Sequence, residues 1–250
     1  MQFTYQGYAA LIERLRGHSY QFANYFDWQN YSKCVILRHD IDTSIDKAVE
    51  LAKYENMVKN GIGDGVKSTY YVLLTSNFYN VFSADNLCKL KQIVSYGHTL
   101  GLHFDEMAYK DEVGDPLAIR EKIEKECSVL TDALDLPIKT FSFHRPSKEI
   151  LDAQIEIEGL VNSYASTFFK DFKYLSDSRR RWREPVDEII ESEQYPRLHI
   201  LTHAFWYQQR EEDIGQTISN FVNAAGSQRY AALKENITDL SSIMEESEVR

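Results

Sequence analysis

The sequence predicts an α/β protein built on a closed or nearly closed barrel of parallel strands, each followed by a helix. Two observations predict it: strand-like and helix-like segments alternate along the chain, and there are about seven such units. A third observation argues against a dinucleotide-binding α/β fold, because the sequence has no glycine-rich phosphate loop of that kind. The 250 residues suffice for a full hydrophobic core. We therefore expect a single domain over residues 1–250.

The expected strands are short runs rich in aliphatic, β-branched or aromatic residues. They cover residues 34–39, 67–75, 98–105, 138–146, 160–165, 173–178 and 197–206.

The expected helices have apolar residues at helical spacing and recognisable ends. Ser44 and Gly61 bound one helix, Ser83 and Gly97 bound the next, and Pro116 lies in the first turn of a third. The full set covers residues 5–17, 44–61, 83–97, 115–134 and 147–154, followed by a long polar helical region over 211–247.

The net charge of -10 argues against nucleic acid or an anionic membrane as the main partner. The N-terminus has no signal-peptide pattern, and no apolar run approaches the ~20 residues of a transmembrane helix. Three widely spaced cysteines, Cys34, Cys88 and Cys127, form neither a disulfide framework nor a cysteine zinc site. We expect three buried thiols in a cytoplasmic protein.

Ionisable side chains collect at the ends of four expected strands. The segments RHDID (38–42), LHFDE (102–106), FHRPS (143–147) and LTHAFW (201–206) each close an apolar run. In a β/α barrel the carboxyl ends of the strands surround the active site. Aspartate and histidine together are ligands for hard and borderline divalent metals. The sequence therefore predicts a polar site, with a metal, at one mouth of the barrel.

Asp40 and Asp42 are two residues apart, so on an extended chain they face the same side as Arg38, while His39 faces the other. Two carboxylates that face one point repel unless a cation or a proton lies between them. The alternative is that they are loop or helix-capping acids, since Asp42 precedes the next helix. We expect His39 to be packed and hydrogen-bonded rather than a ligand. His18, His98 and His199 are expected to be structural.

Five segments, in their order and spacing over roughly residues 33–207, resemble the motifs of the polysaccharide deacetylase family, the family-four carbohydrate esterases. They are LRHDID, GHTLGLHFD, FSFHRPS, SDSRRRW and LTHAFWY. The resemblance implies a distorted (β/α) barrel of about seven strands that removes acetyl groups from amino sugars with a bound divalent metal, for which zinc is expected. The most similar variety is a divergent branch associated with lipopolysaccharide or capsule synthesis.

The resemblance also implies roles for the residues of the first two motifs. Asp40 matches the catalytic base, and Asp42 and His103 match metal ligands. Met107 stands where the family has a second histidine, and a thioether is a poor ligand for zinc. We propose Asp42, His103 and His144 as a rearranged ligand set, with Asp105 as the reserve.

The later motifs imply the remaining roles. Arg145 resembles the arginine that orients the base, and Asp177 the acid that pairs with that arginine. His203 matches the general acid. The expected substrate-binding aromatics are Trp182, Phe205 and Trp206.

The expected function is a metal-dependent deacetylase that hydrolyses the N-acetyl or another acyl group of a sugar, free or linked to a nucleotide or lipid. One alternative is a catalytically silent relative that binds metal or carbohydrate, which Met107 favours. Another is a hydrolase of a non-sugar C–N bond, such as a cyclic amide. The segment SRRRWRE (178–184) is either a solvated basic turn or, if functional, suited to an anionic substrate. The oligomeric state is left open.

Overall fold

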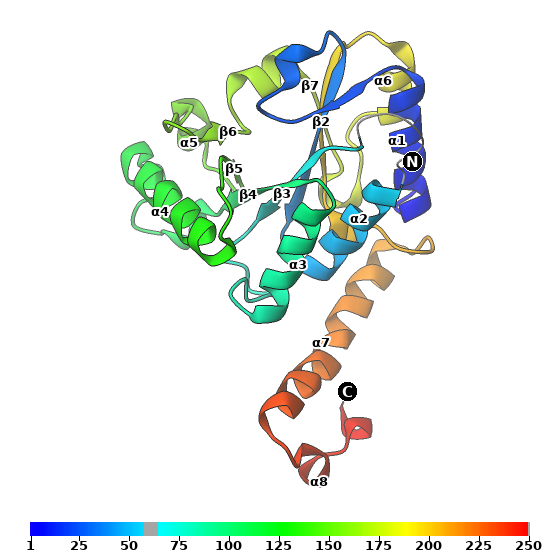
Figure 1. Ribbon diagram of the computed structural model, residues 1–250, viewed down its shortest axis with the longest axis vertical. Helices are drawn as coiled ribbons and strands as arrows, with labels where there is room; N and C mark the ends of the chain where they lie inside the picture. Colours follow the sequence, from blue (N-terminus) through cyan, green and yellow to red (C-terminus); the bar gives the residue numbers. More distant parts are fainter. Residues whose placement is uncertain (58–64, 250) are drawn as a thin grey trace. The chain divides into compact units, whose positions relative to one another are not determined.

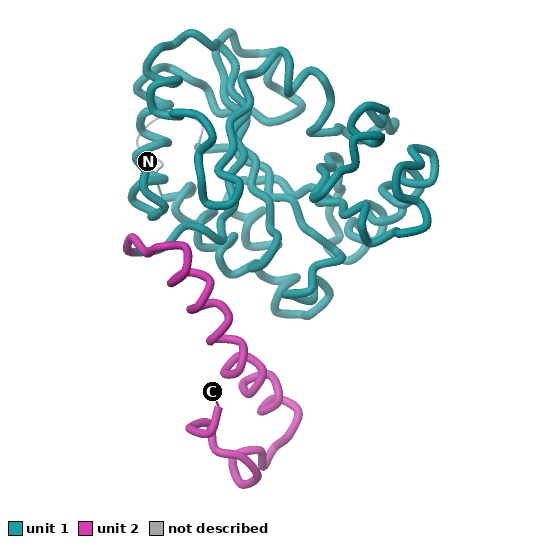
Figure 2. Tube along the Cα trace, turned by 180° about the vertical axis from the view of Figure 1, so that it is seen from behind, with its two compact units in different colours: residues 1–209 teal, residues 210–250 magenta. Residues whose placement is uncertain are grey.

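A computed structural model describes residues 1–57 and 65–249. The chain divides into two compact units, residues 1–209 and residues 210–250 (Figure 2). The first unit contains the sheet and six of the helices described below, and the second contains two helices. The single domain over 1–250 stays a prediction.

Parallel strands form one curled sheet in the first unit (Figure 1). The strands are β1 (Gln21–Ala23), β2 (Cys34–Ile41), β3 (Ser68–Val72), β4 (Thr99–Phe104), β5 (Thr140–Phe143), β6 (Val161–Asn162), β7 (Lys173–Ser176) and β8 (Arg197–Thr202). The order is β6-β5-β4-β3-β2-β8-β7, with β1 beside β2. The predicted distorted barrel is confirmed. It is not closed, because no ladder joins β6 to β7 within the described residues.

Strand β2 is the centre of the sheet. One edge pairs with β8, and the other is shared by β1 along residues 34–36 and β3 along residues 37–41. All eight residues of β2 are buried. A strand paired on both edges and covered on both faces cannot leave its polar side chains in water, so each needs a partner inside the protein.

The helices of the first unit are α1 (Tyr5–Gly17), α2 (Ile45–Met57), α3 (Ala84–Ser95), α4 (Pro116–Leu134), α5 (Lys148–Ala153) and α6 (Val186–Ser192). Ser83 caps α3 by accepting a hydrogen bond from the Asn86 amide, as the sequence predicted. The last residues of the helix expected over 44–61, residues 58–61, lie outside the described residues. β1 and α6 were not predicted from the sequence, because they are only three and seven residues long.

Two clusters of buried side chains lie on the two faces of the sheet. Apolar side chains such as Val35, Leu37 and Phe104 pack with those of helices α1 to α5 in the main core. The alternate positions of the strands face inward, where a smaller cluster contains Cys34, Ile36 and Tyr71. Because side chains alternate along a strand, polar residues on the inward face all come from one set of alternate positions.

A row of rings lies at the opening between β6 and β7. Tyr164 follows β6, Phe169 lies in the π-helical turn Thr167–Asp171, and Tyr174 belongs to β7. The Tyr164 and Phe169 ring centroids are 5.1 Å apart, and those of Phe169 and Tyr174 are 4.4 Å apart. These ring contacts connect the two edge strands, between which the described residues form no backbone pairing.

His39 lies on the helix-covered face and belongs to a buried polar network centred on Glu55, as the packed histidine that the sequence predicted. The Glu55 carboxylate accepts hydrogen bonds from Tyr8, Ser68 and Tyr70 and lies 3.1 Å from His39 Nε2. Burial raises the pKa of Glu55, but the nearby histidines and hydroxyl donors outweigh it and lower that pKa to about 2. The network satisfies a charge that is costly to bury alone.

His98 and His199 are also structural, as expected. His98 lies 2.8 Å from Ser68 Oγ, and His199 lies 2.8 Å from the Tyr25 hydroxyl. One cysteine prediction was wrong: Cys34 and Cys127 are buried, but Cys88 is exposed. Its position on α3 turns it away from the face whose Leu90 and Ile93 pack on the core.

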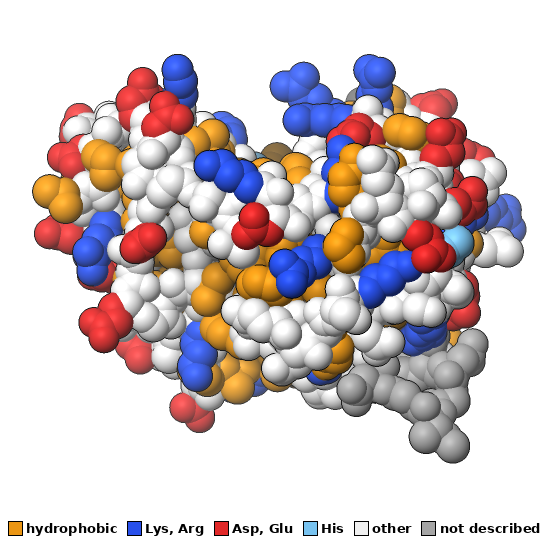
Figure 3. Space-filling model, turned by 90° about the horizontal axis from the view of Figure 1, so that it is seen from above, with side chains coloured by type: hydrophobic (Ala, Val, Ile, Leu, Met, Phe, Trp, Pro, Cys, Tyr) orange, Lys and Arg blue, Asp and Glu red, His pale blue; other side chains and the backbone are white. Residues whose placement is uncertain are grey.

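The second unit contains α7 (Ile214–Asn236) and α8 (Leu240–Ile243), within the predicted helical region. Asp213 caps α7 through the Gln216 amide, and the Tyr230 hydroxyl donates to the Met244 carbonyl. Among the residues that the structure describes, no helix has the length and apolar character to cross a membrane. Acidic and basic side chains are interspersed over the face drawn in Figure 3.

Gly101 on β4 is required by close packing on the inward face. A Cβ atom there would lie 2.5 Å from Thr140 Oγ1 and 2.5 Å from the Tyr71 ring. We expect Gly101→Ala to destabilise the protein by about 1–3 kcal/mol, the usual cost of overpacking, measured by urea unfolding. Gly17→Ala is the control, since a Cβ there meets nothing within 4 Å. Equal midpoints for the two variants would contradict the predicted clash.

Glu126 on α4 predicts a pH-dependent stability. Burial raises its pKa to about 7, although the Tyr109 hydroxyl donates to it at 2.5 Å. The folded protein therefore favours protonated Glu126, and this stabilisation is complete below about pH 4.5 and is lost as the pH rises through 7. Wild type should lose roughly 1–3 kcal/mol between pH 5 and pH 8 that Glu126→Gln keeps. The exposed Glu121→Gln on the same helix should follow wild type; a Glu126→Gln profile parallel to wild type would refute the assignment.

Candidate metal centre

Three side chains from the carboxyl ends of β2, β4 and β5 meet on the inward face. Asp42 follows β2, His103 is near the end of β4, and His144 follows β5. Asp42 Oδ1 lies 3.2 Å from His103 Nε2 and 3.2 Å from His144 Nδ1, and these two nitrogens are 3.2 Å apart. The three residues predicted as ligands are thus brought together, with their ligand atoms in an equilateral triangle.

The triangle fits a divalent metal. A tetrahedral ion bound at about 2.0–2.1 Å holds its ligand atoms roughly 3.3 Å apart, close to the observed separations. Asp42 Oδ1 is buried and has no hydrogen bond of ordinary geometry within the described part of the chain. An acceptor that two imidazole nitrogens approach, yet that is left without a hydrogen bond, is better satisfied by a cation. The donor set of one carboxylate and two imidazoles suits zinc and similar ions.

Ser142 fixes the orientation of His103. Its Oγ lies 2.6 Å from His103 Nδ1, so Nε2 is the nitrogen that faces Asp42 and His144. Ser142 is fully buried on the inward side of β5. Partners of this kind set the tautomer and direction of a metal-binding histidine.

Burial raises the pKa of Asp42, but His103 and His144 outweigh it and hold that pKa well below its ordinary value. For His144, burial lowers the pKa and Asp42 more than compensates. Asp42 is therefore an anion at neutral pH, which is the form that binds a metal.

Asp40 lies beside the triangle in a buried ion pair. Arg38 Nε and Nη2 each donate to one Asp40 oxygen at 2.8 Å, and Arg38 is fully buried. Burial raises the pKa of Asp40, but the Arg38 charge, with His103, outweighs it and lowers the pKa. The Asp40 Oδ2 atom is 3.5 Å from His103 Nε2. An ionised carboxylate is thus held next to the candidate metal position by a planar bidentate contact.

His203 follows β8 across the site from His144. Its Nδ1 lies 2.7 Å from Asp177 Oδ1, and its Nε2 is 3.8 Å from Asp42 Oδ2. Asp177 is fully buried and also accepts from the His203 amide and the Tyr207 hydroxyl. Burial lowers the pKa of His203, but Asp177 outweighs it and raises that pKa to about 9. The imidazole is therefore protonated at neutral pH, with Nε2–H facing the site.

The three residues of the triangle line one cavity of about 530 Å³ together with Asp40 and His203. Its walls also include Arg145, Tyr164, Phe169, Tyr174, Ser178, Arg179, Arg183, Leu201 and Trp206.

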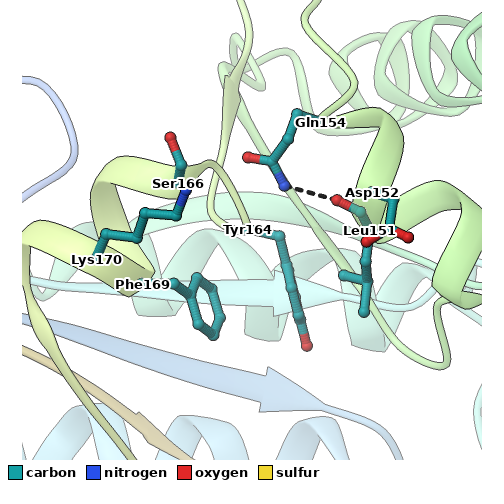
Figure 4. A pocket seen from close by; sticks show the side chains of 7 residues that line it. All are labelled: Leu151, Asp152, Gln154, Tyr164, Ser166, Phe169 and Lys170. Carbon is teal, nitrogen blue, oxygen red and sulfur yellow. Dashed lines mark hydrogen bonds between the residues drawn. The ribbon is translucent and has the colours of Figure 1, made fainter.

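A second hollow of about 390 Å³ shares Tyr164 and Phe169 with this cavity. Figure 4 shows it from close by, with Lys170 and Gln154 among its lining residues.

Two partnerships differ from those that the family resemblance implied. Arg145 lies at the cavity but pairs with Asp105, and its side chain is 61% exposed. Arg38, which shares a face with Asp40 on the same strand, holds that carboxylate instead. Asp177 pairs with His203 rather than with Arg145, because it follows β7, the neighbour of β8 in the sheet, whereas Arg145 follows β5.

The reserve ligand Asp105 is occupied elsewhere. Besides its pairing with Arg145 it accepts a hydrogen bond from the Met107 amide. Met107 lies in the short 3-10 turn Glu106–Ala108 and is 37% exposed.

Trp182 and Trp206 both pack against the main core, but of the three predicted substrate-binding aromatics only Trp206 is among the described residues that line the cavity. The ring centroids of Phe205 and Trp206 are 4.9 Å apart, but Phe205 is not among the residues that line the cavity. Ser142 and Tyr164 were not predicted from the sequence. Ser142 had a readable signal, because Thr140 and Ser142 place hydroxyls at alternate positions of the strand TFSF, opposite its two phenylalanines. Tyr164 had none, since its role depends on where the loop after β6 runs.

No family model matches the sequence, and neither does any curated protein. Among solved structures, a CE4 family pseudoenzyme from Bacillus anthracis aligns with 78% of this chain and 62% of its own, at 15% identity and a TM-score of 0.42. The deacetylase PplD of Streptococcus pyogenes, in complex with acetate, aligns with 79% of this chain and 80% of its own, at 15% identity and a TM-score of 0.43. The chain thus spans less than two thirds of the Bacillus structure.

The Ser142–His103 contact predicts an effect on metal affinity. We expect Ser142→Ala to weaken binding of a divalent ion by roughly 10–100-fold, the usual cost of losing a group that orients a ligand. Competition with a chromophoric chelator measures it. Ser163→Ala is the control, because Ser163 is equally buried but its hydroxyl has no hydrogen bond to any of the three candidate ligands. An unchanged affinity in Ser142→Ala would exclude His103 as a ligand oriented in this way.

Proposed function

We propose that the chain is a metal-dependent hydrolase of the polysaccharide deacetylase superfamily, which removes an acetyl or another acyl group from the nitrogen of an amino sugar. One observation carries the proposal. The Asp42–His103–His144 triangle has two groups beside it: an ionised carboxylate, Asp40, 3.5 Å from His103 Nε2, and a protonated imidazole, His203, whose Nε2 is 3.8 Å from Asp42 Oδ2. Hydrolysis of an amide needs a base and an acid on the two sides of the group attacked.

Asp42, His103 and His144 would hold the metal, with zinc as the proposed ion. A divalent cation there supplies a Lewis acid, which polarises the acyl carbonyl and lowers the pKa of a water molecule. The remaining chemistry belongs to the side chains of this chain.

Asp40 is the proposed base. Its carboxylate is ionised at neutral pH, and both oxygens are oriented by Arg38, so the side chain cannot rotate away from the site. It takes a proton from the attacking water. A low pKa makes Asp40 a weak base in bulk water, but its fixed orientation beside the proposed metal position compensates.

His203 is the proposed acid. Its Nδ1 is held by Asp177, which leaves the Nε2 proton for the departing amine. An amine leaves readily only when its nitrogen is protonated, so the raised pKa of His203 matches the task. Asp177 acts through His203 and is a positioning residue. Arg145 and Trp206 border the cavity and are proposed to contact the substrate.

The sugar, the acyl group and the pathway are proposed from the motif resemblance alone: a precursor of a surface polysaccharide or lipopolysaccharide, free or linked to a nucleotide or lipid, in the cytoplasm.

The test combines elemental analysis with acetate release from N-acetylated amino sugars. Wild type should hold about one divalent ion per chain, and Asp42→Ala and His144→Ala should lose it. Asp40→Asn and His203→Gln should keep the metal and lose roughly 10²–10⁴-fold in rate. Asp105→Asn is the control that should keep the metal.

Two results would count against the proposal. A wild type without metal after incubation with zinc would favour a silent carbohydrate-binding relative. Acyl release from cyclic amides alone would place the activity on a non-sugar substrate.

A further inference from the structure

The loop after β7 presents basic side chains to the cavity. Ser178, Arg179 and Arg183 line it, whereas Arg181 is exposed and lies outside its lining. Other residues anchor the loop: Trp182 packs against the main core, and the Arg180 guanidinium lies 5.3 Å from the centre of the Phe3 ring. Anchoring and cavity-lining positions are therefore separate within this short segment.

Arg179 and Arg183 have no acidic partner. Across residues 1–57 and 65–209, no carboxylate lies within 4.0 Å of either guanidinium. The other arginines near the site differ: Arg38 pairs with Asp40, and Arg145 pairs with Asp105. Two exposed cations on one cavity wall thus lack the neutralisation that their neighbours have.

The charges that line the cavity leave a positive excess beside the metal centre. Its acidic members are Asp40, which Arg38 neutralises, and Asp42, which faces two histidines. The chain as a whole carries a net charge of -10, so a positive wall here is opposite in sign to the protein. A neutral sugar gains nothing from it, whereas an anionic one is attracted and retained.

We propose that Arg179 and Arg183 bind a phosphate group carried by the sugar substrate. Guanidinium groups donate two parallel hydrogen bonds to phosphate oxygens, and two arginines suit one phosphate or a diphosphate. That this substrate is a sugar with an acyl group rests on the proposed function. The phosphate contact rests on the two arginines instead. The shared chemistry is a phosphate ester of a sugar, as found in sugar phosphates, nucleotide sugars and lipid-linked sugars.

The backbone conformation at Arg179 allows a substitution that removes its side chain without straining the loop. Arg179 has φ +59°, in the left-handed region that glycine adopts without strain. Arg179→Gly therefore removes the guanidinium while keeping the loop conformation accessible. Arg183→Ala removes the second cation, and Arg181→Ala in the same segment removes a charge that does not face the cavity.

The experiment measures binding with sugars that have no acyl group, so that turnover plays no part. Calorimetry compares glucose, glucose 1-phosphate, UDP-glucose and glucose linked by diphosphate to a short prenyl chain. At least one phosphorylated sugar should bind 10-fold or more tightly than glucose, with an advantage that falls as salt rises. Arg179→Gly with Arg183→Ala should abolish the advantage, and Arg181→Ala should keep it. The phosphorylated sugar that binds tightest identifies the source of the phosphate.

Because phosphate also binds divalent metals, the titrations are repeated after removal of metal by a chelator, where the effect of the arginines should persist. Equal affinity for glucose and all phosphorylated sugars would overturn the proposal, as would an equal loss in Arg181→Ala. This failure is distinct from failure of the proposed function. Acetate release without a preference for phosphorylated sugars would refute only the phosphate site. Binding of phosphorylated sugars without acetate release would refute only the proposed deacylase activity.

Discussion

The buried contact between Arg38 and Asp40 is the constraint on which the site depends. Removing both charges from water is expensive, and only a geometry with two good hydrogen bonds repays it. That geometry arises within one strand, because residues two apart share a face. The Tyr71 and Tyr164 rings lie 5.3 Å and 4.8 Å from the guanidinium and complete its surroundings. The pair therefore couples the central strand to the opening beside β6.

The polar inward face is possible because the helix-covered face carries the hydrophobic burial. Val35, Leu37 and Ile41 on β2 pack under helices, so Arg38 and Asp40 can occupy the other side of the same strand without removing the main core. On β2 the helix-covered face also carries one polar side chain, His39. It lies beside Glu55, whose buried carboxylate is satisfied by hydroxyl and imidazole groups. Each buried charge on β2 thus has a specific partner.

The open edge between β6 and β7 gives the site its shape. A closed ladder there would complete the barrel, whereas the tyrosine and phenylalanine rings line a cavity whose walls also include basic side chains. The loop after β7 is displayed at the same opening, beside the metal triangle. Aromatic faces and guanidinium groups together suit a ligand with a ring and an anion.

The sequence by itself determined the parallel β/α architecture and the faces of its strands, because alternation and periodicity are local properties of the backbone. It therefore placed Arg38, Asp40 and Asp42 on one side and His39 on the other, and it brought His103 and His144 to the same mouth. Only the tertiary structure decided the partners between segments, Asp177 with His203 and Arg145 with Asp105. Such pairings depend on strand order and loop paths, which no local pattern encodes.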